Sequence, residues 1–404
     1  MKEPVLIGRP PLIRQTNAQI LLNLFREKGP CSKADLVRAS GLSAPSVTNV
    51  VAHLAQAGLV EPIGEGDSTG GRPPDILRFR AERGCVAGIE VGADSLHFLL
   101  CDLSGRELGQ TRVPIEKASS SPSIICKKIG QALRELLAKH KQSEDQLLGL
   151  AVGVPAIVNV NTGTVVAYSA LQDWNLVNLG EMLAREVKCQ VTIENDTNLA
   201  AQGEHYCGAA QSEQDFIFMS IGTNVGAGIV LGGKIHHGSQ WSAGEIAYLR
   251  LPHILRRQPT IHEFGELEAV LTSSGILKSW YGESRKSDRN TRGSRKEMDA
   301  IGVLDLAQTG DARAQKIVRQ RADIVSDIIV NLSLILNPGL VLLGGEIGSH
   351  PILVASVLKQ LEGSEFAVTR VGTGALGPRA VLWGAISLAM NAISSVLLPQ
   401  PMAR

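Results

Sequence analysis

Residues 86–102 read VAGIEVGADSLHFLLCD, and residues 216–231 read FIFMSIGTNVGAGIVL. Both stretches are short apolar strands joined through a turn that contains glycine, which is the pattern of a β-hairpin. Further apolar strands follow each hairpin, at 147–155 and 190–194 after the first and at 341–345 after the second. Amphipathic segments at 122–140, 311–336 and 380–396 predict helices between and after them. The repetition predicts two α/β lobes with a cleft between their glycine turns.

Length and composition set the limits of this interpretation. At about 150 residues per domain, 404 residues predict two or three domains. A low aromatic fraction of 4% and 42 glycines favour an α/β protein over a lectin-like sandwich. The net charge of +1 leaves no global field for DNA or a membrane. No apolar run is long enough for a transmembrane helix, and the N-terminus does not resemble a signal peptide. Six cysteines without a CxxC pair predict reduced thiols in a cytoplasmic protein.

The first 60 residues carry the pattern of three short helices. A helix over 17–28 stops at Gly29-Pro30, Ser32 suits the N-cap of a second, and Ser43 suits the N-cap of a third. A strand begins near Leu59, and residues 65–74 form a loop before another strand at 76–79. This order is typical of a winged helix-turn-helix, and the alternative is a three-helix packing module with a solvated turn.

The third helix would face DNA with small or hydrogen-bonding side chains, which suit base edges in a major groove. Seven basic residues against three acidic ones in residues 1–60 add local attraction for phosphate. The loop arginine, within Gly-Arg-Pro, resembles a minor-groove hook. The residues predicted to bind DNA are Ala44, Pro45, Ser46, Thr48, Asn49, His53 and Arg72.

The remaining motifs resemble, in their order, those of the ROK family of sugar kinases and sugar-responsive repressors. The residues that carry the resemblance are Glu90-Val91-Gly92, Gly153-Val154-Pro155, 194–198 (ENDTN), Gly222-Thr223, Gly244-Glu245-Ile246 and Leu267-Glu268. The resemblance covers essentially the whole chain, and an N-terminal winged helix is typical of the repressor branch. It implies a duplicated actin-like, hexokinase-like (ribonuclease H-like) body. The implied parts are a DNA-binding domain over 1–82, a first lobe over 83–197 completed by 380–404, and a second lobe over 198–379.

The resemblance also implies which residues meet a sugar. Asp196 stands at the position of the kinases' general base, and carboxylates accept hydroxyl hydrogen bonds well. The sugar-binding residues it implies are Asn195, Asp196, Glu245 and Glu268. The alternative roles are helix capping for the first two and solvated acids for the others.

Both phosphate-binding turns depart from the kinase pattern. The first turn of the kinases reads Asp-x-Gly-Gly-Thr, whereas this chain has Ala93 and Asp94 in its last two places. Asn224 replaces the last glycine of the second turn. A Cβ and a carboxylate at a phosphate turn oppose ATP binding. These departures predict that the chain is not an enzyme and needs no cofactor, and that the turns persist because the hairpins need them.

The zinc ligands of many relatives are also missing, which predicts a body that folds without metal. Tyr248 stands at the histidine position, and Pro259, Ile261 and Glu266 stand at the three cysteine positions. Packing by apolar side chains, Leu251 and Phe264 among them, is expected to hold this loop instead. The neighbouring pair His236-His237 is interpreted as an ordinary loop.

Taken together, the sequence predicts a repressor of sugar uptake or catabolism genes. It would bind operator DNA as a homodimer or tetramer and release it when a sugar or sugar derivative enters the cleft. One alternative is an ATP-dependent sugar kinase that carries a DNA-binding domain. Another is a DNA-binding protein whose cleft has lost its ligand and serves dimerisation.

Overall fold

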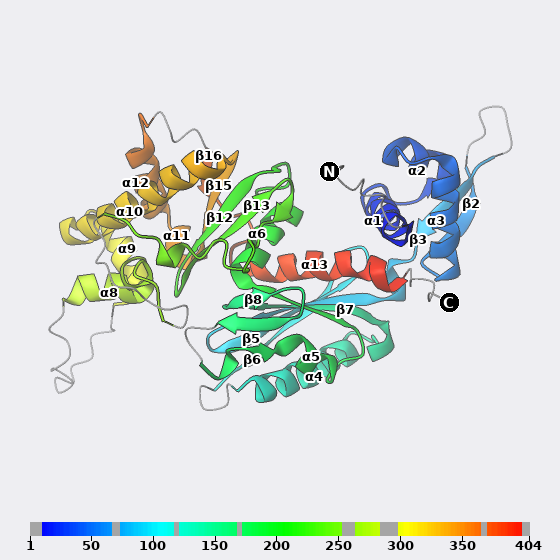
Figure 1. Cartoon of the computed structure of the whole chain (residues 1–404), viewed down its shortest axis with the longest axis horizontal. Coiled ribbons are helices and arrows are strands. Elements are labelled where there is room, and N and C mark those ends of the chain that lie inside the picture. The colour runs from blue at the N-terminus through cyan, green and yellow to red at the C-terminus, as the bar shows by residue number, and fades with distance from the viewer. Residues whose placement is uncertain are drawn as a thin grey trace, which may run out of the picture.

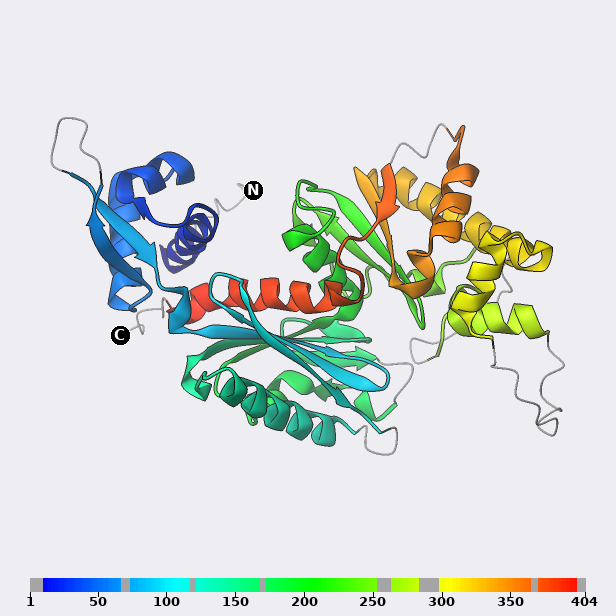
Figure 2. The same ribbon diagram turned by 180° about the vertical axis from the view of Figure 1, so that it is seen from behind.

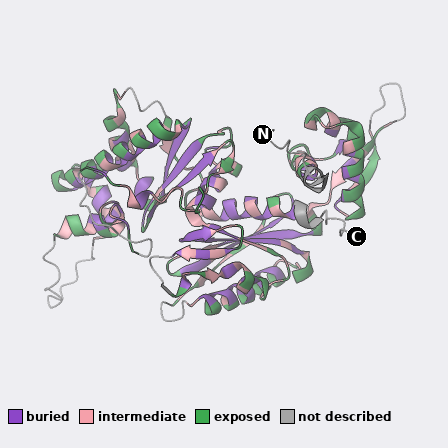
Figure 3. Ribbon diagram, viewed as in Figure 1, coloured by how far each residue is buried: buried purple, intermediate pink, exposed green. Residues whose placement is uncertain are grey.

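The computed structural model describes residues 10–66, 73–116, 121–167, 172–252, 263–282, 298–364 and 370–397. The chain forms a small helical unit followed by two α/β lobes, with a long C-terminal helix across the middle (Figure 1). Buried residues concentrate along the central strands of the two large sheets, where helices cover them (Figure 3).

The N-terminal unit is a winged helix. Its sheet has the order β1-β3-β2. Its elements are α1 (Pro10–Lys28), β1 (Cys31–Ser32), α2 (Lys33–Ser40), α3 (Ala44–Gln56), β2 (Val60–Glu65) and β3 (Asp75–Phe79). Ser32 caps α2 and Ser43 caps α3, as the sequence predicts, and Asp35 completes a reciprocal capping box with Ser32. Helix α1 is longer than predicted because it begins at Pro10 rather than near Asn17.

The two lobes share one sheet topology. In each, a strand sits between an antiparallel hairpin partner and a parallel strand, and a second parallel strand lies at the edge. The first sheet has the order β11-β7-β4-β5-β6 and the second β14-β13-β12-β15-β16. The first contains β4 (Cys85–Val91), β5 (Ser95–Asp102), β6 (Glu107–Pro114), β7 (Leu147–Val154) and β11 (Gln190–Asn195). The second contains β12 (Phe216–Ile221), β13 (Val225–Leu231), β14 (Lys234–Ile235), β15 (Leu340–Gly344) and β16 (Arg370–Thr373).

Helices complete both lobes. The first lobe has α4 (Pro122–Lys139), α5 (Leu179–Ala184), and a small sheet of β8 (Ile157–Asn159), β9 (Thr164–Ala167) and β10 (Val177–Asn178). The second has α7 (Glu268–Leu271), α8 (Ser273–Tyr281), α9 (Ala300–Gln308), α10 (Ala312–Leu336), α11 (Gly345–Gly348) and α12 (Pro351–Leu361). The glycine-containing turn of the second hairpin is confined to 222–224, because Val225–Gly228 already belongs to β13.

Two helices meet at the centre of the molecule, α6 (Asp196–Cys207) and α13 (Ala380–Leu397). They approach so closely that a Cβ on Gly384 would overlap the carbonyl oxygen of Leu199, and one on Gly203 would overlap that of Ala380. The buried Glu204 fixes the segment before α13, since its carboxylate accepts the backbone N–H groups of Ala375 and Leu376 at 2.9 Å. These contacts hold the two helices in one relative position.

Helix α13 also lies against the sheet of the first lobe and reaches the winged helix (Figure 2). Apolar side chains of α1 and α13 belong to one continuous core, which includes Phe25 and Ile393. Arg26 reinforces the contact: its Nε donates to the carbonyl oxygen of Leu103 at 2.8 Å, and its Nη2 lies 3.4 Å from Met390 Sδ. The winged helix is therefore packed against the body.

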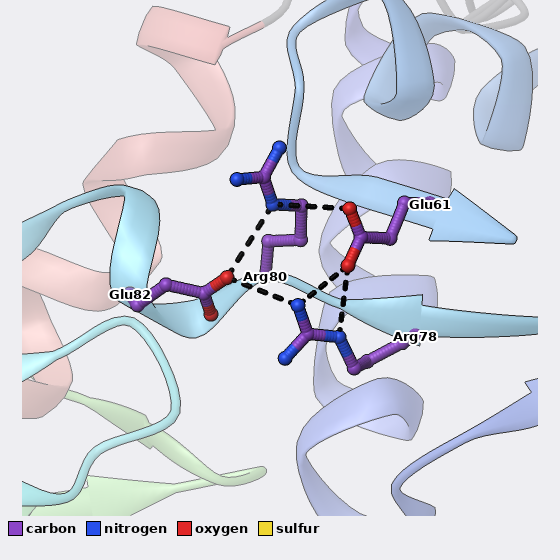
Figure 4. Close-up of polar contacts among 4 residues, drawn as sticks. All are labelled: Glu61, Arg78, Arg80 and Glu82. Carbon is purple, nitrogen blue, oxygen red and sulfur yellow. Dashed lines mark hydrogen bonds and ion pairs between the residues drawn. The ribbon is translucent and has the colours of Figure 1, made fainter. Parts of the chain in front are cut away.

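A group of four charged side chains lies where the wing joins the first lobe (Figure 4). Arg78 Nη2 on β3 lies 2.5 Å from Glu61 Oε1 on β2 and 3.2 Å from Glu82 Oε1. Arg80 Nε lies 3.4 Å from a carboxylate oxygen of each glutamate. Each arginine bridges the same two carboxylates, so the network ties the base of the wing to the segment that enters the first lobe.

Among the described helices, none is long and apolar enough to cross a membrane.

We predict that Gly384→Ala destabilises the protein by about 1–3 kcal/mol, the usual cost of forcing extra atoms into a packed core. The added methyl group must separate α13 from the backbone of α6. Denaturant unfolding measures the change. Gly372→Ala is the control, because a Cβ there meets only the Leu342 side chain at 3.8 Å. Equal stability of the two variants would contradict the close crossing of α6 and α13.

Candidate functional site

A pocket of about 360 Å³ opens between the two lobes. The start of α6, the turn between β12 and β13, the segment around Glu245, and the starts of α7 and α13 all line it. The structure thus brings together all four residues that the sequence predicts to bind sugar, which are Asn195, Asp196, Glu245 and Glu268.

Asn195 and Asp196, at the junction of β11 and α6, have different roles. Asn195 is the helix N-cap, because its Oδ1 accepts the N–H of Asn198 at 3.0 Å while its Nδ2 donates to the carbonyl of Ala156 at 3.1 Å. Asp196 is the first residue of the helix and accepts the N–H of Thr197 at 2.7 Å. Capping therefore belongs to Asn195, which leaves the carboxylate of Asp196 at the pocket.

The two glutamates differ in how much of their carboxylates the protein already uses. Glu268 accepts the backbone N–H of Gly265 at 2.9 Å and that of Val225 at 3.4 Å. The backbone N–H of Glu245 donates to the carbonyl of Ser242 at 3.3 Å, but its carboxylate caps no helix and has no hydrogen bond within the described part of the chain. Its carboxylate is the acceptor with most free capacity, and a ligand hydroxyl group can use it.

The pocket is rich in acidic groups. Burial raises the pKa of Glu90 to about 7. Burial and the neighbouring Glu90 raise the pKa of Asp196 to about 7. Burial, Asp196 and Glu268 together raise the pKa of Glu245 to about 7. No lysine, arginine or histidine occurs among the described residues that line the pocket. Such a site accepts hydrogen bonds from hydroxyl groups and opposes anions.

The first turn, which would hold phosphate in a kinase, is occupied by contacts within the protein. Asp94 accepts hydrogen bonds from Ser95 Oγ at 2.7 Å and from Arg112 Nη2 at 3.2 Å. Glu90 Oε2 lies 3.2 Å from Nδ1 of His97. In the second turn, Thr223 and Asn224 line the pocket.

The recognition helix α3 exposes the polar residues that the sequence predicts for it. Val47, Val50, Val51 and Leu54 are buried, whereas Ala44, Pro45, Thr48, Asn49 and His53 are exposed, and Ser46 is partly exposed. His53 Nδ1 lies 2.6 Å from the carbonyl oxygen of Asn49. Arg72 lies outside the described residues, so its role stays a prediction.

Sequence reasoning missed two features of this region. Trp241 lines the pocket, and nothing in the spacing of the surrounding residues indicates it. His237, interpreted as part of an ordinary loop, has its Nε2 2.7 Å from Oε2 of Glu194 on β11. Because Glu194 belongs to the first lobe and His237 to a loop of the second, this pair bridges the lobes.

The structure describes the two ends of the loop after Tyr248, for which the sequence predicts apolar packing in place of zinc ligands. The Tyr248 hydroxyl donates to the carbonyl of Glu263 at 2.6 Å. Leu251 is buried as expected, but Phe264 is 53% exposed, so its predicted packing role is wrong. Pro259 and Ile261 lie outside the described residues, and the described ones contain no group of His, Cys, Asp and Glu that could hold a metal ion. A metal-free body stays a prediction.

The fold and site define a winged helix joined to a two-lobed body of the actin-like, hexokinase-like class. A family model described as ROK family matches residues 86–392, and one described as MarR family matches residues 13–72. The chain belongs to the ROK family.

Three known proteins show the range of its relatives. A putative xylose repressor of Caldicellulosiruptor sp. is 25% identical over 395 residues, covering 95% of this chain and 98% of the relative. A glucokinase of Halalkalibacterium halodurans is 28% identical over 296 residues, covering 71% and 88%. The solved structure of a ROK family transcriptional regulator, a homolog of the E. coli MLC protein, superposes with a TM-score of 0.78 at 22% identity, covering 96% and 98%.

The raised pKa of Glu245 predicts a pH-dependent cost of folding. An unfolded glutamate titrates near pH about 4.3. Between that value and about 7, the folded chain retains a proton that the unfolded chain has lost, so stability falls as pH rises and the loss is complete above about 7. Glu245→Gln removes this titration. We expect its melting temperature, relative to the unsubstituted chain, to increase from pH 5 to pH 8.

The exposed Glu362 provides the control, since Glu362→Gln removes a carboxylate that is not in the pocket. A difference in melting temperature that is the same at pH 5 and pH 8 for Glu245→Gln would contradict a buried, proton-retaining Glu245.

Proposed function

We propose that this protein is a cytoplasmic transcriptional repressor that binds operator DNA through its winged helix and releases it when a neutral sugar enters the pocket between the lobes. The regulated genes would serve sugar uptake or catabolism. We further propose that residues 1–82, residues 83–197 with 380–404, and residues 198–379 act as three units. A homodimer, or a tetramer built from dimers, would place two copies of α3 on an inverted repeat.

One observation carries this proposal: α13 starts in the pocket, where Ala380 and Val381 line it, and continues into the core beneath α1. A DNA-binding domain joined to the body by a flexible linker would not respond to ligand binding in the pocket. Here a change at the start of α13 has a packed path to the winged helix. Because an effector shifts an equilibrium only by binding one state better, the sugar would favour a lobe arrangement in which the two α3 helices no longer match the operator.

The acceptor-rich pocket supports a hydroxylated, uncharged effector. Asp196 and Glu245 offer carboxylate oxygens to hydroxyl groups, and their mutual repulsion would fall when those groups donate hydrogen bonds. One relative is named as a putative xylose repressor and another as a glucokinase, so D-xylose and D-glucose are the first sugars to test.

The second candidate is an ATP-dependent sugar kinase, favoured by the retained Asp196 at the general-base position. The sequence of the first turn opposes it, because the carboxylate of Asp94 stands in place of the kinases' threonine and pairs with Arg112. An assay for ADP release with ATP and a panel of hexoses and pentoses separates the two functions. A third candidate, a pocket without a ligand, is tested by calorimetry with the same sugars.

The variant Asp196→Asn tests the effector site. It retains the size of the side chain and leaves the Asn195 cap intact, but removes the charged acceptor. We expect the sugar-free protein to bind operator DNA as the unsubstituted chain does, while more sugar is required to release it. A gel-shift titration of the complex with sugar measures both quantities.

Asp173→Asn is the control, since it makes the same change outside the pocket. If Asp196→Asn releases DNA at the same sugar concentration as the unsubstituted chain, Asp196 has only a structural role.

The variant Asn49→Ala tests the DNA interface. If the amide of Asn49 contacts a base through two hydrogen bonds, its loss costs about 1–3 kcal/mol of binding free energy. Gln56→Ala is the matched control, because Gln56 is exposed at the other end of α3. A gel shift at fixed salt compares them, and full affinity of Asn49→Ala would place base recognition elsewhere.

A further inference from the structure

Trp241 adopts a backbone conformation that large residues rarely adopt. Its φ is 58°, in the left-handed region, which only three other non-glycine residues share in the described part of the chain. Such a conformation costs free energy, so it persists where neighbouring contacts impose it. Trp241 belongs to the loop between β14 and the segment at Glu245, and it lines the pocket between the lobes.

Hydrogen bonds on both sides of Trp241 hold this loop. The N–H of Ala243 donates to the carbonyl of His237 at 3.2 Å, and the N–H of Ala227 on β13 donates to the carbonyl of Gly244 at 2.8 Å. The His237 side chain in turn pairs with Glu194, two residues before Asp196. The loop is thus anchored to its own lobe and to the strand that precedes the acidic site, which fixes the tryptophan at the pocket.

The other two aromatic residues among the described residues that line the pocket, Phe218 and Tyr248, make contacts elsewhere. Phe218 is 4% exposed and packs within the core of the second lobe. The Tyr248 hydroxyl donates a hydrogen bond to the carbonyl of Glu263. Trp241 is half-buried, and no described hydrogen bond or ring contact engages its indole. It offers a broad apolar surface in a pocket whose other notable groups are carboxylates.

A cyclic sugar needs both kinds of surface. Its hydroxyl groups point outward around the ring and seek acceptors, while its C–H groups form an apolar face that packs on the negative face of an aromatic ring. Five carboxylates line the pocket, those of Glu90, Asp196, Glu245, Glu268 and Glu346, and no described basic side chain does. The carboxylates among these groups that are ionised would repel an acidic sugar or a sugar phosphate.

We propose that Trp241 is the platform on which the ring of a pyranose stacks, and that the surrounding carboxylates restrict the effector to uncharged sugars. This proposal rests on the proposed function, because it assigns the ligand class of the same pocket. The left-handed backbone at Trp241 belongs to the loop that leads to Glu245, so the indole and that carboxylate line the same pocket.

The variants Trp241→Gly and Trp241→Phe test the assignment. Glycine adopts a φ of 58° without strain, so Trp241→Gly should fold with an unchanged or higher melting temperature. We expect it to bind D-xylose or D-glucose at least about tenfold more weakly by calorimetry, while Trp241→Phe retains most of the affinity. Operator binding without sugar should be unchanged in both variants.

Tryptophan fluorescence gives a second readout. Sugar should change the emission of the unsubstituted chain and of Trp280→Phe, whose ring lies outside the pocket near Arg313, at the same concentrations, whereas any change in Trp241→Gly should require at least about tenfold more sugar. Unchanged sugar affinity in Trp241→Gly would overturn the stacking role and leave the proposed function standing. Tighter binding of D-glucose 6-phosphate than of D-glucose would overturn the neutral ligand class. An unsubstituted chain that binds none of these sugars would overturn both proposals.

Discussion

The close crossing of α6 and α13 is the constraint on which the rest of the structure depends. It exists because Gly203 and Gly384 carry no Cβ where the two backbones meet. On the other side, Gly88 of β4 allows α13 to lie directly on the first sheet, since a Cβ there would come within 2.8 Å of the carbonyl of Leu382. The helix that leads to the winged helix is therefore held between α6 and a sheet, and both helices begin at the pocket.

Because of this arrangement, the winged helix is packed against the body instead of being joined to it by a flexible linker. The winged helix shares its apolar core with α13, Arg26 connects it to the turn after β5, and the arginine–glutamate network at the base of the wing adds a second attachment. Each single ion pair at this exposed network contributes little, so the apolar core provides most of the attachment. A change of the lobes that moves α13 would therefore move the winged helix with it.

The sequence predicts much of this fold because periodicity and capping residues are local signals. The capping box at Ser32, the hairpins, and the long helix after Asp311 all follow from residues near one another in the chain. The site was predicted through the family resemblance, which identified Asp196 and Glu245 as members of one pocket. The pairing of His237 with Glu194 and the place of Trp241 depend on how distant loops meet, and no local pattern encodes that. The exposure of Phe264 shows the same limit, because an apolar side chain in a loop carries no signal for its burial.

The proposed function couples sugar binding in the pocket to DNA binding by the winged helix, and thermodynamic linkage tests this coupling directly. If sugar weakens operator binding by some factor, the operator must weaken sugar binding by the same factor. Calorimetric titration of the full chain with D-xylose or D-glucose, with and without saturating operator DNA, measures this reciprocity. We expect the DNA complex to bind sugar more weakly than the free protein, by the same factor by which sugar weakens operator binding. Identical sugar affinity in the presence and absence of operator would contradict it.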